Sequence, residues 1–90
     1  MASFRHDSSA LTPHHFIEKL SPRRREVLEL ISKGLTNDDI ASILCVSPGT
    51  VRIHVAGLLS ELQVANRTEA AAAYFEWKST TVQLTKVLER

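Results

Sequence analysis

The chain lacks the features that mark secreted, membrane-spanning or disulfide-linked proteins. Its one cysteine, Cys45, cannot form an internal disulfide, and its place in an apolar segment favours a small buried hydrophobic side chain. No apolar run approaches the roughly 20 residues that a membrane-spanning helix needs, and the N-terminus has no hydrophobic region of a signal peptide. We therefore expect a soluble, cytoplasmic protein with no membrane partner.

Charge of one sign and catalytic groupings are scarce as well. The chain has 11 lysines and arginines against 10 acidic residues, a formal net charge of +1. This is well short of the strongly basic balance of many nucleic-acid binders, so charge neither demands nor forbids such a partner. There is no nucleophile–base pair or phosphate loop, and His6, His14 and His15 lie in a tail without the spacing of a metal site. We predict no enzyme, no metal site and no cofactor.

The length limits the size of the core. A chain of 90 residues forms one small domain whose marginal core benefits from oligomerisation or from attachment to something larger. We predict a flexible tail or linker over residues 1–19, a folded domain over 20–79 and a C-terminal extension over 80–90 that allows a short extra helix. Helix-like spacing also allows a short lead-in helix that contains Phe16, Ile17 and Leu20.

Two helices are predicted to flank the centre of the domain. Ser21 can cap a helix with Pro22 in its first turn, and apolar spacing carries that helix to about Lys33. A last helix starts near Asn66, with Glu69 in the position of a capping box. Its run of alanines favours a helix and permits close approach by a neighbour.

Between these two helices, the sequence predicts a pair of helices joined by a tight turn. Thr36 and Asp39 form a capping-box pair at the start of a short helix, and Ser47 can cap a second helix that has Pro48 at its first position. The apolar face expected for the short helix consists of Ile40, Ala41, Ile43 and Leu44. On a helical wheel the second helix buries Val51, Val55, Leu58, Leu59 and Leu62 and presents Gly49, Arg52, Ile53, Ala56 and Ser60. This arrangement indicates a helix-turn-helix.

Motifs from residue 20 to about residue 74 agree, in order and without gaps, with one known family. They are Leu20-Ser21-Pro22-Arg23, Glu26-Val27-Leu28, Gly34-Leu35-Thr36-Asn37, Ile40-Ala41, Leu44, Val46-Ser47-Pro48, Thr50-Val51-Arg52, His54, Leu62, Val64 and Asn66-Arg67-Thr68-Glu69-Ala70. The chain thereby resembles the LuxR-type (GerE-like) C-terminal domain of bacterial transcription regulators. The resemblance implies an all-α four-helix bundle with a central helix-turn-helix. In this family the third helix lies in the major groove of DNA and the fourth commonly forms the dimer contact.

The resemblance also implies roles for individual residues. It places Arg52, Ile53 and Ala56 at base edges, where an arginine can bind guanine and an isoleucine can pack on a thymine methyl. It places Ser47 and Thr50 near phosphates, at a helix N-terminus that favours anions. Further phosphate candidates are Arg67 and Arg23, and the residues expected at the dimer interface are Ala70, Ala73, Tyr74 and Trp77.

The sequence departs from the family pattern at positions that set charge or capping. Family members usually carry a polar or basic residue where this chain has Gly49, and again at Ala56 or Gly57. They often carry Lys where this chain has Glu61, and usually the Glu of a capping box where it has Arg24. Gly57 costs up to about 1 kcal/mol against alanine inside a helix, although its missing side chain allows a close approach by backbone or partner.

These departures leave two readings of function. From Ser47 to Val64 the only full charges are Arg52 and Glu61, which cancel, so we expect weak intrinsic affinity for DNA. The leading hypothesis is a sequence-specific DNA-binding domain that acts as a homodimer, with a sensor or receiver domain N-terminal to it in a longer protein. The alternative is a degenerate helix-turn-helix that serves as a protein–protein interaction module.

Overall fold

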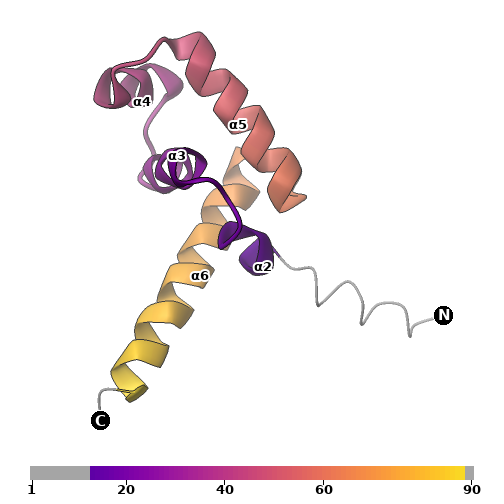
Figure 1. Cartoon of the computed structure of the whole chain (residues 1–90), viewed down its shortest axis with the longest axis vertical. Helices are drawn as coiled ribbons and strands as arrows, with labels where there is room; N and C mark the ends of the chain where they lie inside the picture. The colour runs from indigo at the N-terminus through magenta and orange to yellow at the C-terminus, as the bar shows by residue number, and fades with distance from the viewer. Residues whose placement is uncertain (1–12, 89–90) are drawn as a thin grey trace, which may run out of the picture.

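The computed structural model describes residues 13–88, with side chains placed for residues 15–80, and this part of the chain is all-helical (Figure 1). Its elements are α2 (Pro13–Ile17), α3 (Pro22–Ser32), α4 (Asn37–Leu44), α5 (Pro48–Leu62) and α6 (Arg67–Leu88). The predicted all-α fold is confirmed. The predicted tail up to residue 12 and the last two residues lie outside the described part.

The N-terminal caps fall at the predicted residues. The Ser21 hydroxyl accepts a hydrogen bond from the backbone N–H of Arg24 at 3.2 Å, and Ser47 does the same for Thr50 at 3.1 Å. Thr36 and Asp39 form the reciprocal capping box, with both hydrogen bonds at 3.1 Å. Each cap satisfies a backbone donor that the first turn of a helix leaves unpaired. The starts of α3, α4 and α5 are therefore fixed by local sequence.

The C-terminal ends of α4 and α5 repeat one motif. Cys45 (φ 60°) and Gln63 (φ 59°) adopt the left-handed conformation that glycine usually supplies. After each, a valine N–H bonds back into the helix, Val46 to the carbonyl of Ala41 at 3.0 Å and Val64 to that of Leu59 at 3.1 Å. Both valines pack against the core. Cys45 itself is exposed, so the prediction of a buried cysteine is wrong, because the turn directs Val46 inward instead.

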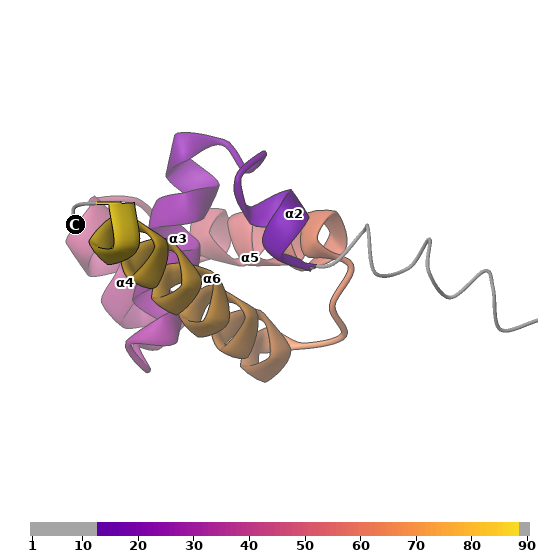
Figure 2. The same cartoon turned by 90° about the horizontal axis from the view of Figure 1, so that it is seen from below.

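The core takes residues from every helix. Its buried members are Ile17, Leu20, Val27, Leu28, Ile31, Ile40, Ala41, Val51, Leu58, Leu62, Ala70, Ala73 and Tyr74. Ile17 is fully buried, and α2 packs on α5 and α6 (Figure 2). The lead-in helix therefore forms, but it ends at Ile17, so the predicted member Leu20 lies beyond it. Within the tail predicted over residues 1–19, residues 13–17 are helical and Ile17 contributes to the core.

The last helix is longer than predicted. α6 continues without a break to Leu88, so the expected boundary near residue 79 and the separate short helix are wrong. Interior threonines and valines cost a helix only tenths of a kcal/mol each, which is too little to end one without a breaker. In Figure 1 the C-terminal part of α6 extends past the other helices.

Among the described helices, none taken singly is long and apolar enough to cross a membrane, although α4 and α5 together, bent by 109° at their junction, meet that length and composition test.

Candidate nucleic-acid interface

α5 divides into a buried and an exposed side as the helical wheel predicts. Val51, Leu58 and Leu62 are fully buried, and Val55 and Leu59 are partly buried against the core. On the opposite side the exposed residues are Arg52, Ile53, Ala56 and Ser60. Ile53 leaves 69% of its surface in solvent. We call Arg52, Ile53 and Ala56 the reading face.

The start of α5 provides donors for an anion. Its first turn carries no acidic residue, so the partial positive charge of the helix N-terminus is not offset locally. The hydroxyls of Ser47 and Thr50 lie 3.0 Å apart and stand beside this terminus. Ser47 is exposed and Thr50 is partly buried. The two predicted phosphate residues are therefore brought together next to the reading face.

The short helix before the turn differs from its prediction at one position. Ile40 and Ala41 are buried as expected, whereas Ile43 is 55% exposed. Ile43 lies to one side of the stripe centred on Ile40, Ala41 and Leu44, because successive helical residues turn by about 100°. The apolar face predicted for α4 is thus narrower than its four residues suggested.

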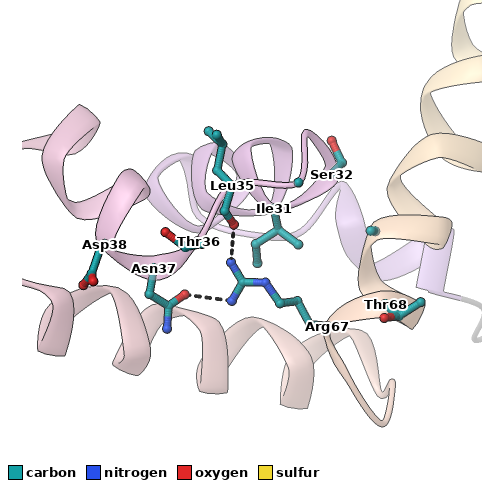
Figure 3. A pocket seen from close by; sticks show the side chains of 10 residues that line it. Ile31, Ser32, Leu35, Thr36, Asn37, Asp38, Arg67 and Thr68 are labelled. Carbon is teal, nitrogen blue, oxygen red and sulfur yellow. Dashed lines mark hydrogen bonds between the residues drawn. The ribbon is translucent and has the colours of Figure 1, made fainter.

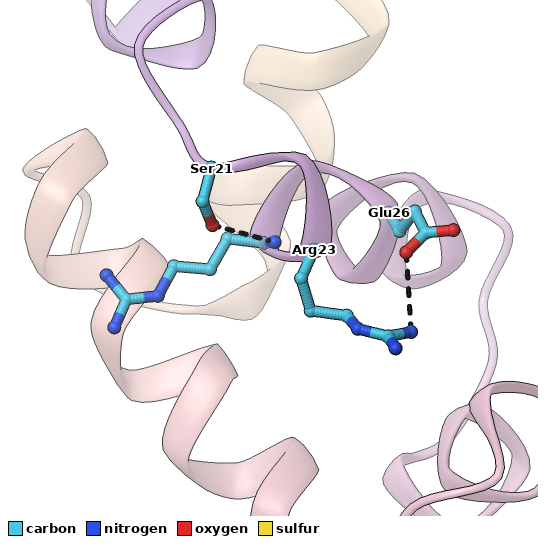
Figure 4. Close-up of polar contacts among 4 residues, drawn as sticks. Ser21, Arg23 and Glu26 are labelled. Atoms are coloured by element: carbon cyan, nitrogen blue, oxygen red, sulfur yellow. Dashed lines mark hydrogen bonds and ion pairs between the residues drawn. The ribbon is translucent and has the colours of Figure 1, made fainter.

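The three consecutive arginines at the start of α3 point to three different partners. Arg23 is exposed and pairs with Glu26 on its own helix at 3.4 Å (Figure 4). Arg25 donates to the carbonyls of Ile17 at 3.2 Å and Glu18 at 2.9 Å, so it ties α3 to α2. Arg23 is therefore the arginine of this run that holds no partner on another helix among the described residues.

Arg24 reaches across to α5. Its Nη1 donates to Glu61 Oε1 at 2.9 Å, with 31% and 46% of the two side chains exposed. The guanidinium passes over Gly57, where a β-carbon would lie 2.5 Å from Arg24 Cζ. We call Arg24, Gly57 and Glu61 the Arg24 bridge. The sequence alone does not join the three residues, because 37 residues separate the two members of the ion pair.

A family model covers the helix-turn-helix of α4 and α5. It is described as "Bacterial regulatory proteins, luxR family" and matches residues 18–74. The chain belongs to this family. The helix-turn-helix is therefore that of a DNA-binding transcription regulator family.

The chain is also similar to individual regulatory proteins. The chain is 38% identical to the transcriptional regulatory protein LiaR of Bacillus subtilis over 71 residues, 79% of this chain and 32% of that protein. It is 42% identical to the response regulator protein VraR of Staphylococcus aureus over 59 residues, 66% and 28% of the two chains. It is 38% identical to the nitrate/nitrite response regulator protein NarL of Escherichia coli over 60 residues, 67% and 28%. The aligned part spans about a third or less of each relative.

Within this luxR-family fold, Arg67 holds α6 to the turn before α4. Its guanidinium donates to Asn37 Oδ1 and to the carbonyl of Leu35, both at 2.7 Å (Figure 3). The side chain is partly buried at the edge of an open hollow of about 650 Å³. The sequence placed Arg67 near phosphate, but the structure engages its guanidinium in contacts between helices.

The residues predicted at a dimer interface pack within the chain. Ala70 is fully buried and Ala73 and Tyr74 are each 6% exposed, while Trp77 donates from Nε1 to Glu18 Oε2 at 3.4 Å and lies under the Arg25 guanidinium. Ala70, Ala73 and Tyr74 lie on the inward side of α6, and Trp77 is partly buried beside them. Their helical spacing is the signal that could have assigned them to the core. Phe75 is 60% exposed instead. The dimer interface itself stays a prediction.

Proposed function

We propose that this domain binds double-stranded DNA in a sequence-specific manner, with α5 in the major groove. The observation that carries the proposal is the reading face, where an exposed arginine and an exposed isoleucine share the second helix of a helix-turn-helix. A large apolar side chain exposed next to an arginine on this helix matches what base edges offer, a thymine methyl beside guanine acceptors.

The contacts divide into readout and positioning. Arg52 reads a guanine, Ile53 packs on a thymine methyl, and Ala56 keeps the helix close to the bases. Ser47 and Thr50 hold phosphate at the N-terminus of α5, and exposed Arg23 adds a phosphate contact from α3. For Arg67 we favour a positioning role, because two hydrogen bonds of 2.7 Å hold its partly buried guanidinium against Asn37 and the carbonyl of Leu35.

The domain is proposed to act as a homodimer on a two-fold site. The exposed side of α6, which includes Phe75, replaces the buried residues as the candidate dimer surface. Half-sites about one helical turn apart follow from two symmetric α5 helices in successive major grooves. In a longer protein, a sensor or receiver domain N-terminal to this one would offset a weak intrinsic affinity for DNA. By holding two copies together, it would raise the effective concentration at which the second copy meets its half-site.

An amide NMR titration tests the proposal. The labelled protein is titrated with a random-sequence duplex at low salt and then at physiological salt. We expect shifts centred on residues 47–60 that fade as salt rises. Shifts that leave residues 47–60 unaffected, or no shifts at low salt, would contradict the major-groove placement of α5.

The alternative function is that of a protein–protein interaction module. Exposed apolar residues on three helices favour it, namely Ile43, Ile53 and Phe75. Salt separates the two functions, because DNA contacts weaken steeply with salt and an apolar interface does not.

A further inference from the structure

Three residues of α3 and α5 meet in the Arg24 bridge. The Arg24 guanidinium binds Glu61 at 2.9 Å and lies against α5 where Gly57 has no side chain. Any larger residue at 57 would force the guanidinium away, since its Cβ would lie within 2.5 Å of both Cζ and Nη2 of Arg24. A side chain added at position 57 would therefore displace the guanidinium, which is the far end of a flexible side chain, rather than any backbone.

The Arg24 bridge borders the reading face. Ile53, Gly57 and Glu61 are spaced by four residues and so form one row along α5. The Arg24 guanidinium lies on this row one turn beyond Ile53, next to exposed Ala56. Its Nη1 is taken by Glu61, and an arginine has five N–H donors. Donors therefore remain for an anion close to the groove-facing residues.

The bridge places its cation on α3 and its anion on α5. Arg24 and Glu61 form an attractive pair between the two helices, and the cation comes from α3. The charges of α5 itself cancel, so the Arg24 guanidinium of α3 adds a cation beside this helix.

We propose that Arg24 is a DNA-phosphate contact supplied by α3 and held over Gly57 by Glu61. This assignment rests on the proposed DNA binding. Glu61 acts as a positioning residue that fixes the guanidinium beside the groove. Gly57 has no side chain and so leaves room for the guanidinium against α5.

The test is the salt dependence of binding to a random-sequence duplex, measured by fluorescence anisotropy on the whole chain. Arg24→Ala should reduce the slope of log affinity against log salt by about one, the value of one lost phosphate contact. A rise from about 50 to about 200 mM salt then costs the variant roughly threefold less affinity than it costs the wild type. Arg24→Gln, which keeps a hydrogen-bonding side chain without charge, should give the same reduction.

A matched control removes one positive charge from the other end of α3. Lys33 has 61% of its side chain exposed and pairs with Glu29 at 3.9 Å. Lys33→Ala should keep the wild-type slope, and circular dichroism should show equal helix content in all variants. A slope that falls equally for Arg24→Ala and Lys33→Ala reports net charge alone and overturns the assignment.

Gly57→Ala tests the placement without changing charge. It should weaken binding when residue 24 is arginine, and it should have no further effect in the Arg24→Ala background. Equal weakening in both backgrounds would mean that DNA itself approaches Gly57, which overturns the bridge. A wild type that binds with a steep slope that Arg24→Ala leaves unchanged refutes this assignment alone, whereas a wild type that does not bind DNA refutes the proposed function with it.

Discussion

α5 and α6 each have a buried side and, among the side chains that the structure describes, one large apolar residue in solvent, yet their outer sides differ. α5 leaves Ile53 69% exposed beside Arg52, and α6 leaves Phe75 60% exposed while its other two aromatic side chains pack inward. The inner side of α6 anchors the neighbouring helices α2 and α3. The comparison separates α5, whose exposed side we propose to enter a DNA groove, from α6, whose described residues mainly contribute to the core.

The largest expected effect lies on the inner side of α6. Tyr74→Ala removes a side chain that is 6% exposed and should cost about 3 to 5 kcal/mol, the range for deleting a buried aromatic. Urea unfolding measures the loss. Phe75→Ala is the control, with a change within about 0.5 kcal/mol for the monomer. Comparable losses for the two variants would mean that the inner and outer sides of α6 are assigned the wrong way round.

The next effect lies on the outer side of α5. Arg52→Ala should lose about 1 to 3 kcal/mol of discrimination at one base pair, with folding stability unchanged because the side chain is exposed. Thr50→Ala should weaken all sequences alike, since a phosphate contact carries no sequence information. Competition binding with single-base variants of a selected site measures both. A loss for Arg52→Ala that is the same on specific and random DNA would remove its readout role.

The contrast between the two helices also explains which parts could be predicted from the sequence. Ser47 with Pro48 fixed the start of α5, and one stripe of branched apolar residues then fixed its buried side. α6 has alanines on several sides, and an alanine is tolerated both in the core and in solvent, so its inward stripe was assigned to a partner. Local sequence patterns predict where a helix is capped and which of its residues share one side. Which side packs against the rest of the chain depends on residues that are distant in the sequence.

The three arginines of α3 also show what a local sequence pattern cannot predict. Arg23, Arg24 and Arg25 are alike as a sequence pattern, and their partners lie on α3, α5 and the α2 segment. No local rule distinguishes them. The contact from Arg24 to Glu61 spans 37 residues, and only the crossing of α3 and α5 brings the two side chains together.

A smaller effect concerns the end of α5. Gln63 has φ 59°, a left-handed conformation that costs a non-glycine residue roughly 1 kcal/mol. Gln63→Gly should therefore stabilise the fold by somewhat under about 1 kcal/mol after the added freedom of the unfolded chain is subtracted. A thermal melt should rise by a few degrees. Gln63→Ala is the control and should give no rise, so equal gains from both variants would exclude backbone strain as the cause.

The smallest effect probes the ion pair of the Arg24 bridge without DNA. Its side chains are 31% and 46% exposed, so the pair should contribute about 0.2 to 1 kcal/mol. Arg24→Glu alone places two acidic groups together, and Glu61→Lys alone places two basic groups together. The double variant restores attraction, and its glutamate at position 24 would also complete the capping box that begins at Ser21. In a double-mutant cycle by urea unfolding, the double variant should be more stable than the sum of the single changes predicts. Strictly additive changes would mean that core packing alone holds α3 to α5. The ion pair of the Arg24 bridge would then position a charge without stabilising the fold.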